Sequence, residues 1–351
     1  MKSQQLIDLL EGLKLRYDII TAAGSGKVVI LERGARVIGL FTDEDSENAL
    51  WVHHNLTDPH YASDHYVDGE DWNIGGDRTW LSPEIEYFIG DLDDLWNTYA
   101  VQRALDPGYY AFKDRHADTI ALSQNTAIQA HRSNKTIKFR MDKTFRSCED
   151  PLLNVGIVDK DTLKYSFTGY ELKTELTLES PTEAIPPLSL WHLFQIPKGG
   201  EVIIPTYGTA EVDRFFGPEM AGNPAVSNGM VKFTLNMATS SKISIKAPYI
   251  TGRVGYIQSS APNDACLLIR NFNVNPSARY EDVWATKLND PGHCVQCYND
   301  DGTLGQFGEL EIHTPILNPA VDGNNIKDVN QVWCYRGTEQ SIRLLCKIIL
   351  G

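Results

Sequence analysis

The sequence predicts an all-β protein, a sandwich or barrel with a short N-terminal helix. Short apolar segments recur along the chain, several with alternating polar residues, and turn residues separate them about every ten positions. Helical periodicity is confined to residues 3–13, with a weaker helical pattern at 83–96. No Gly/Ser/Pro-rich linker and no fixed-period repeat divides the 351 residues. We therefore expect one large β domain.

The N-terminal segment is the clearest helix. Leucine recurs at helical spacing between residues 6 and 13, which predicts an amphipathic helix. Residues 28–41, VVILERGARVIGLF, then predict two short strands joined by a turn. We expect residues 1–24 to form a helix and a lead-in strand that pack on a single domain formed by residues 25–351.

Strand patterns continue to the end of the chain. YELKTELTLES at 170–180 alternates cleanly, and residues 189–205 predict a strand, a Lys-Gly-Gly turn and a second strand. The apolar segment SIRLLCKIIL at 341–350 is interpreted as a final buried strand. The proline-containing segment 179–187 is the best candidate for a long crossover between two halves of the domain.

Composition and charge argue against two classes of partner. The net charge is −14, from 46 acidic and 32 basic residues, so we expect no nucleic acid and no anionic membrane as a partner. No apolar run approaches the ~20 residues that span a bilayer. The N-terminal segment lacks the pattern of an export signal. We expect a cytoplasmic protein, or a periplasmic or secreted one if a signal peptide has been removed.

The cysteines predict no metal centre. In a chain of this size, disulfides are not needed for stability. Cys294 and Cys297 form a CxxC motif in HCVQC. One CxxC without a second pair is weak evidence for zinc, and the segment lacks the βαβ context of a redox motif. We interpret the six cysteines of the chain as reduced and structural.

The segment GELEIHTP at 308–315 places three ionisable side chains on alternate residues. In a strand, Glu309, Glu311 and His313 share one face, and the apolar residues between them share the other. This pattern is typical of an edge strand with a solvated face, or of the floor of a polar binding site. A carboxylate close to an imidazole can carry out general acid–base catalysis.

A second segment, GGDRTW at 75–80, combines a glycine pair with an arginine and a tryptophan. The glycines permit a tight turn or a close backbone approach to a ligand. Arg78 offers a rigid fork of donors, and Trp80 offers a flat apolar face. The segment is not a dinucleotide-binding fingerprint. It is either a ligand site or a structural turn whose arginine pairs with a nearby acid such as Asp77 or Glu84.

Histidines stand out in two further segments. His192, in SLWHLFQIP, shares a strand face with apolar residues, so it is either a buried imidazole or a proton donor in an apolar-walled pocket. Residues 51–66 are rich in histidine and aspartate, but their spacing matches no standard set of metal ligands. We expect a loop that lies over a site, with His53 as a residue that contacts the ligand.

Three stretches together carry a resemblance to a known family. GGDRTWLSPE, SLWHLFQIPKGG and GELEIHTP, in that order, resemble an uncharacterised branch of the galactose-mutarotase-like (aldose 1-epimerase-like) superfamily. The resemblance spans about residues 25–350. It implies a β-supersandwich with a sugar-binding cleft on the concave face of one sheet, and an activity that needs no metal or organic cofactor.

The resemblance also implies residue roles. True aldose 1-epimerases use an arginine from an early glycine-rich segment to contact the sugar, a mid-chain histidine to protonate the ring oxygen, and a late glutamate as base. Arg78, His192 and Glu311 match these positions. Trp191 stands where an asparagine precedes the histidine, and His313 stands where a glutamine follows the glutamate. These departures change the shape and polarity of the cleft.

We therefore expect a carbohydrate-binding protein with acid–base chemistry at the anomeric carbon. Glu311 is the expected base and His192 the expected acid, while Arg78 and His313 fix hydroxyl groups. The other expected ligand contacts are Trp80, Trp191, His53 and, at the rim, Glu309.

Two alternatives remain open on the sequence. The first is sugar binding without chemistry. The second is hydrolysis or elimination on an oligosaccharide, for which two carboxylates could serve as acid and nucleophile. In either case neutral sugars are the expected ligands, because Glu309 and Glu311 would repel uronates.

Overall fold

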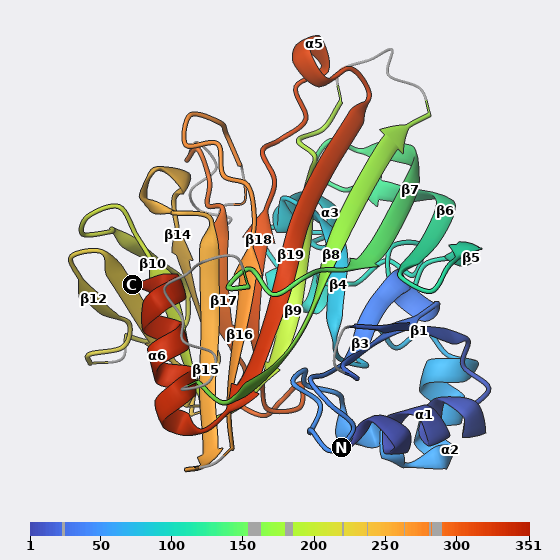
Figure 1. Ribbon diagram of the computed structural model, residues 1–351. Helices are drawn as coiled ribbons and strands as arrows, with labels where there is room; N and C mark the ends of the chain where they lie inside the picture. The colour runs from blue at the N-terminus through green and yellow to red at the C-terminus, as the bar shows by residue number, and fades with distance from the viewer. Residues whose placement is uncertain are drawn as a thin grey trace.

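The computed structural model is built from two antiparallel β-sheets that pack face to face (Figure 1). This arrangement confirms the predicted all-β class with a short N-terminal helix. The structure describes residues 1–22, 25–153, 163–179, 185–219, 221–236, 238–262, 264–280, 282 and 290–351.

Within these ranges, nine strands form the first sheet, which holds the candidate site. In spatial order they are β1 (Tyr17–Thr21), β2 (Lys27–Leu31), β3 (Arg36–Phe41), β4 (Asp77–Ser82), β9 (Ser189–Pro197), β18 (Phe307–His313), β17 (Val295–Asn299), β14 (Ser241–Ile245) and β11 (Val212–Phe216). Strands from distant parts of the chain therefore lie side by side at its centre. Leu193 of β9 pairs with Arg78 of β4 on one side and with Glu311 of β18 on the other.

The second sheet contains ten strands among the described residues. They are β12 (Ala225–Ser227), β13 (Met230–Thr234), β10 (Glu201–Pro205), β15 (Arg253–Ala261), β16 (Asp264–Asn271), β19 (Asn325–Gly337), β8 (Tyr165–Leu178), β7 (Lys135–Ser147), β6 (Thr119–Ala130) and β5 (Ala111–Arg115). The segment 189–205 forms a strand, a turn and a strand as predicted, but β9 and β10 belong to different sheets. The predicted crossover at 179–187 also joins the two sheets, from β8 to β9, and its residues 180–184 lie outside the described residues.

The described residues also form six short α-helices. They are α1 (Ser3–Gly12), α2 (Pro59–Ala62), α3 (Glu84–Tyr87), α4 (Leu95–Thr98), α5 (Pro319–Asp322) and α6 (Glu339–Leu350). The predicted N-terminal helix is α1, and its Leu6 and Leu10 pack against the β2 and β3 end of the first sheet. The weak helical pattern at 83–96 corresponds to two single turns, α3 and α4. No helix within the described residues is long and apolar enough to cross a membrane.

The C-terminal segment is a helix, and its interpretation as a strand was wrong. In α6, Ile342, Leu345 and Ile349 follow helical spacing and are buried on the outer face of the second sheet (Figure 1). The Thr338 side chain caps the helix by accepting a hydrogen bond from the backbone N–H of Ser341 at 3.2 Å. The dense apolar run concealed this periodicity, because a buried strand and a helix lying on a sheet are both rich in apolar residues.

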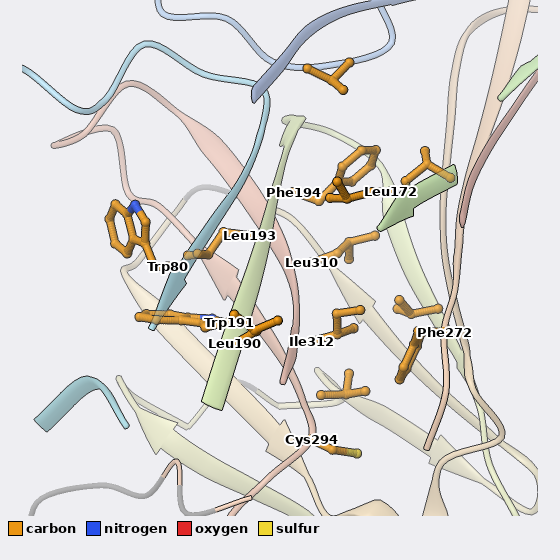
Figure 2. Packing of buried hydrophobic residues seen from close by; sticks show 14 of the residues in the cluster. Trp80, Leu172, Leu190, Trp191, Leu193, Phe194, Phe272, Cys294, Leu310 and Ile312 are labelled. Carbon is orange, nitrogen blue, oxygen red and sulfur yellow. The ribbon is translucent and has the colours of Figure 1, made fainter. Parts of the chain in front are cut away.

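The hydrophobic core lies between the sheets. Leu310 and Ile312 of β18 point into it, together with Phe194 of β9. Figure 2 shows these side chains on the side of β9 that faces the second sheet, while Trp80 and Trp191 lie on its opposite side. The alternation predicted for residues 308–315 is therefore confirmed, with the apolar residues on the core face.

A polar network crosses the core and ties the two sheets together. Asp77 of β4 forms a buried ion pair with Arg270 of β16 and accepts a hydrogen bond from the Tyr170 hydroxyl of β8. His192 of β9 contacts Asp328 of β19, with 3.1 Å between Nε2 and Oδ2. A buried charge without its partner is strongly destabilising, so this network requires one specific alignment of the sheets.

Replacement of Asp77 by asparagine is expected to destabilise the protein by about 3–5 kcal/mol, because it leaves the buried Arg270 guanidinium without its carboxylate partner. The free energy of unfolding from urea titration measures this loss. Asp142→Asn is the matched control, since its pair with Arg140 is partly exposed and contributes little to stability. Equal effects of the two substitutions would contradict the prediction.

Candidate functional site

A cleft of about 850 Å³ opens on the face of the first sheet that points away from the second sheet. Its floor comes from the central strands β4, β9, β18 and β14, and its walls come from the loops around them. Aromatic and aliphatic side chains dominate the lining, with a few charged groups among them. The cleft is lined by Trp72, Arg78, Trp80, Glu84, Trp96, Tyr99, Ala100, Val101, Trp191, Leu193, Phe216, Ser240, Lys242, Tyr298, Asp301, Thr303, Leu304, Phe307, Glu309 and Glu311.

Strand β18 supplies the two predicted glutamates to this floor. Glu309 and Glu311 are 6% and 0% exposed, so both carboxylates are removed from bulk solvent. They lie on the cleft face because Leu310 between them is drawn into the core. The sequence analysis placed Glu309 at the rim of the site. In the structure this side chain is instead buried in the cleft floor.

Glu311 is held at one of its two carboxylate oxygens. Oε2 accepts a hydrogen bond from the Trp191 indole at 2.8 Å and lies 2.9 Å from the Lys242 ammonium. Oε1 is buried and has no hydrogen-bond partner among the described residues. Burial raises the pKa of Glu311 to about 8, although the Lys242 ammonium acts in the opposite direction.

Lys242 is the central cation of the cleft floor. It lies on β14 and is 3% exposed, and its ammonium also lies 3.7 Å from Glu84 Oε2. Burial alone would lower the pKa of Lys242, but the carboxylates of Glu311 and Glu84 outweigh it and raise this pKa. The ammonium also lies 4.7 Å from the centre of the Trp191 ring, a cation–π contact.

Glu84 is the third carboxylate of the cleft, at the start of α3. Its backbone N–H donates a hydrogen bond to Asp282 Oδ1 at 2.9 Å, which fixes the turn that carries it. Burial raises the pKa of Glu84, the Lys242 ammonium lowers it, and the Asp282 carboxylate raises it further. Two carboxylates with raised pKa values therefore flank a single ammonium.

Arg78 occupies the other end of the floor. It forms an ion pair with Glu309 at 2.9 Å, and its guanidinium lies 4.3 Å from the Trp80 ring centre. Behind it, Asp106 accepts a hydrogen bond from the Trp80 indole at 2.8 Å and pairs with the buried Arg36. The positive φ of Gly76, +85°, lets the chain approach the Val37 carbonyl, where a Cβ would lie 2.2 Å from that oxygen. The close backbone packing that Gly76 permits therefore fixes the position of Arg78, which follows two residues later on β4.

His192 lies on the opposite face of the sheet from the cleft. Its Nδ1 lies 3.1 Å from the Thr79 hydroxyl, and its Nε2 faces Asp328 across the core. Alternation along β9 explains this position, because Trp191 points into the cleft and the next residue must point away from it. The imidazole expected to act as the acid is therefore separated from Glu311 by the sheet itself.

The other two predicted histidines also lie outside the cleft lining. His313 is buried beside Trp191, its partner on the neighbouring strand, with the ring centres 5.5 Å apart in a stacked arrangement, and its Nε2 lies 3.1 Å from Gln296 Oε1. Burial lowers the pKa of His313 to about 3, so the ring is neutral at physiological pH. His53 packs against Trp51 and accepts a hydrogen bond from the Asn55 N–H at 3.1 Å. Of the predicted residues, the cleft brings together Arg78, Trp80, Trp191, Glu309 and Glu311.

Sequence reasoning missed Lys242, Glu84 and Trp96. A signal existed for the lysine, since KISIKAP places it at the start of an apolar strand, where a buried cation needs a partner. The sequence analysis considered Glu84 only as a possible partner of Arg78, and the structure pairs Arg78 with Glu309. Trp96 lies in a short helical turn with no strand or motif pattern around it.

The described residues contain no group of three or more His, Cys, Asp or Glu side chains that could hold a metal ion. The two cysteines of the CxxC motif, Cys294 and Cys297, are fully buried and belong to the hydrophobic core. Burial raises the pKa of both thiols.

Comparison with solved structures identifies the fold. A candidate aldose 1-epimerase from Escherichia coli K12 superimposes with a TM-score of 0.52 at 10% sequence identity, covering 91% of this chain and 99% of that one. The Slr1438 protein from Synechocystis sp. PCC 6803 gives a TM-score of 0.51 at 9% identity, covering 93% and 96% of the two chains. At such low identity the likeness is one of fold, and it confirms the galactose-mutarotase-like fold that the sequence resemblance implied.

Comparison at the level of sequence places the chain in a family. A search of curated proteins finds no significant match. The profile of a family described as a family of unknown function, DUF6786, matches residues 15–351. The match covers nearly the whole chain, and the protein therefore belongs to the DUF6786 family, an uncharacterised branch with a galactose-mutarotase-like fold.

Proposed function

We propose that the protein binds a neutral sugar in the cleft and catalyses proton transfer at its anomeric carbon, which interconverts the anomers. The proposal rests on the position of Glu311. One of its oxygens is fixed by Trp191 and Lys242, and the other is buried in the cleft floor with no hydrogen-bond partner among the described residues. A carboxylate oriented in this way is suited to accept a hydroxyl proton.

The surroundings of Glu311 support a sugar as the ligand. Trp72 and Tyr99 line the cleft and are only partly buried, and aromatic faces of this kind pack well against the C–H face of a sugar ring. Trp80 and Trp191 are each 2% exposed, and they contact the Arg78 and Lys242 cations. Arg78 Nη1 has no hydrogen-bond partner among the described residues and could donate to a hydroxyl group, while Nε lies 3.9 Å from Asp106 Oδ2. The shared fold with a candidate aldose 1-epimerase agrees with this assignment.

Anomer interconversion requires a base and an acid. In the proposed reaction, Glu311 takes the proton of the O1 hydroxyl, a second group protonates the ring oxygen, and the bond between C1 and the ring oxygen breaks. The resulting open-chain aldehyde closes again on its other face with both proton transfers reversed. Both transfers lie within one site, so no external co-reactant is consumed.

We assign the acid role to Glu84 in place of His192. Burial raises the pKa of Glu84, which favours the protonated carboxyl that an acid needs. Lys242 lies 3.7 Å from Glu84 and 2.9 Å from Glu311, so its ammonium can stabilise whichever carboxylate carries the negative charge as the proton moves. His192 faces Asp328 on the far side of the sheet and takes no part in this proposal.

The same pair of carboxylates favours one alternative, glycoside hydrolysis. Glu84 and Glu311 both contact a single ammonium, and a glycosidase also uses two neighbouring carboxyl groups, one as acid and one as nucleophile or base. The reaction products separate the two functions, because hydrolysis creates a new reducing end and epimerisation does not.

Replacement of Glu311 by glutamine is expected to slow anomeric equilibration by roughly 10²–10⁴-fold, because the amide cannot accept the proton. One-dimensional proton NMR of freshly dissolved neutral aldoses and short neutral oligosaccharides measures the rate directly. Glu175→Gln is the matched control, since this glutamate lies on β8 of the second sheet and pairs with Lys327.

Each outcome of this experiment has a distinct meaning. Full activity of the Glu311→Gln variant would show that the base is another residue. A sugar whose signals broaden without any change in anomeric rate would make the protein a binding module. A new reducing-end or unsaturated signal would assign hydrolysis or elimination.

The activity is expected to rise with pH as Glu311 ionises. Because the pKa of Glu311 is raised to about 8, kcat/KM should increase as Glu311 ionises, and it should fall again at higher pH as the Glu84 acid loses its proton. The Lys242→Met substitution should move this rise in kcat/KM to higher pH, because the ammonium that favours the Glu311 carboxylate is lost. If kcat/KM rises at the same pH in wild type and in Lys242→Met, the pairing of Lys242 with Glu311 would be contradicted.

The same pKa gives an expected dependence of stability on pH. The folded protein binds the Glu311 proton more tightly than the unfolded chain does, so this residue's contribution to stability is complete below the unfolded pKa and is lost as pH rises through about 8. Urea unfolding on both sides of that pH measures the loss. Glu311→Gln should remove this part of the dependence, and an unchanged profile in the variant would contradict the assignment.

A further inference from the structure

The mouth of the cleft carries a tryptophan that the proposed chemistry does not use. Trp96, on the short α4 segment, is 62% exposed although it lines the cleft. Its ring lies 5.8 Å from that of Phe216 in an edge-to-face arrangement and 6.4 Å from that of Tyr99. An exposed tryptophan leaves a large apolar surface in water, and such surfaces mark interaction sites when they lie beside a cleft.

The cleft separates a charged floor from an aromatic mouth. Glu311, Lys242 and Glu84 are tightly packed at the floor. Trp96 of α4 and Phe216 of β11 lie on elements outside the floor strands β4, β9, β18 and β14, and their contact places them together at one side of the same cleft. A volume of about 850 Å³ is near the upper end for small-molecule sites and is much larger than one sugar ring.

The charges of the lining favour a neutral ligand along the whole length of the cleft. Among the described lining residues the cations are Arg78 and Lys242, and each is already paired with a glutamate, Glu309 or Glu311. Nearer the mouth, the Asp301 carboxylate accepts hydrogen bonds from the Thr303 N–H at 3.0 Å and hydroxyl at 2.6 Å, and adds a negative charge. A polyanionic chain would meet an excess of carboxylates.

We propose that the mouth is a second sugar subsite, and that the preferred ligand is a neutral oligosaccharide of at least two rings. This inference rests on the proposed function. Chemistry at an anomeric carbon with a hydroxyl at O1 takes place only on the reducing-end ring. That ring lies at Glu311, so the rest of the chain extends toward the mouth, where the next ring packs its C–H face on the Trp96 indole.

The test compares each monosaccharide with its disaccharide. The probes are glucose, galactose and mannose, and neutral 1,4-linked disaccharides of the same sugars. Anomeric relaxation by proton NMR gives kcat/KM, and line broadening gives the dissociation constant for each probe. The proteins are wild type, Trp96→Ala, Trp96→Phe and the control Tyr207→Ala, whose aromatic ring is 67% exposed outside the cleft.

We expect wild type to prefer one disaccharide over its monosaccharide by roughly tenfold, which equals about 1.4 kcal/mol. Trp96→Ala should abolish this preference, because the constants for the disaccharide should fall to those for the monosaccharide measured with the same variant. Trp96→Phe should keep most of the preference because it retains a flat ring, and Tyr207→Ala should keep all of it.

Two results would overturn the second subsite and leave the proposed function intact. One is turnover of monosaccharides with no gain for any disaccharide. The other is an equal loss of kcat/KM for the monosaccharide and the disaccharide in Trp96→Ala, which would make Trp96 a wall of the inner site. If no sugar of either length is bound or converted, the proposed function itself fails and the subsite fails with it.

Discussion

The cleft depends on the ion pairs that the Lys242 ammonium forms with Glu84 and Glu311. Three carboxylates, Glu84, Glu309 and Glu311, are brought to one face of the first sheet, where burial penalises each charge. Lys242 contacts two of them, and the Trp191 ring packs against the same ammonium. Arg78 neutralises the third. Without these cations the carboxylates would repel one another, and the floor could not keep its arrangement.

The cation also sets the chemistry that the floor can perform. In the proposed reaction a proton is lost at one carboxyl and gained at the other, and a single ammonium lies between these two acids, whose pKa values are raised by burial. Trp191 contributes twice, since its indole N–H orients Glu311 and its ring face borders the cleft. The neutral His313 stacked beside it supports this ring without adding a charge.

The central strands of the first sheet serve two separate polar systems. On β4, Asp77 and Thr79 point into the core, while Arg78 and Trp80 point into the cleft. The core system aligns the two sheets, and the cleft system offers groups for a ligand. Neighbouring residues can therefore have unrelated roles, which explains why a histidine next to Trp191 resembles a catalytic residue in the sequence and yet contacts Asp328 in the core.

Alternation along a strand is a local property of the sequence. For this reason the sequence by itself determined the β class and the shared face of Glu309 and Glu311. It also singled out Arg78 and Trp80. It also contained the likeness to the galactose-mutarotase-like proteins, which the fold confirms. The segment 341–350 was misread because apolar density conceals periodicity. Only the tertiary structure decided that Lys242, Glu84 and Trp96 meet Glu311 in one cleft, and that His192 does not. The reason is physical: which face of a strand becomes a cleft, and which distant strands border it, depends on sheet pairing between segments far apart in the chain.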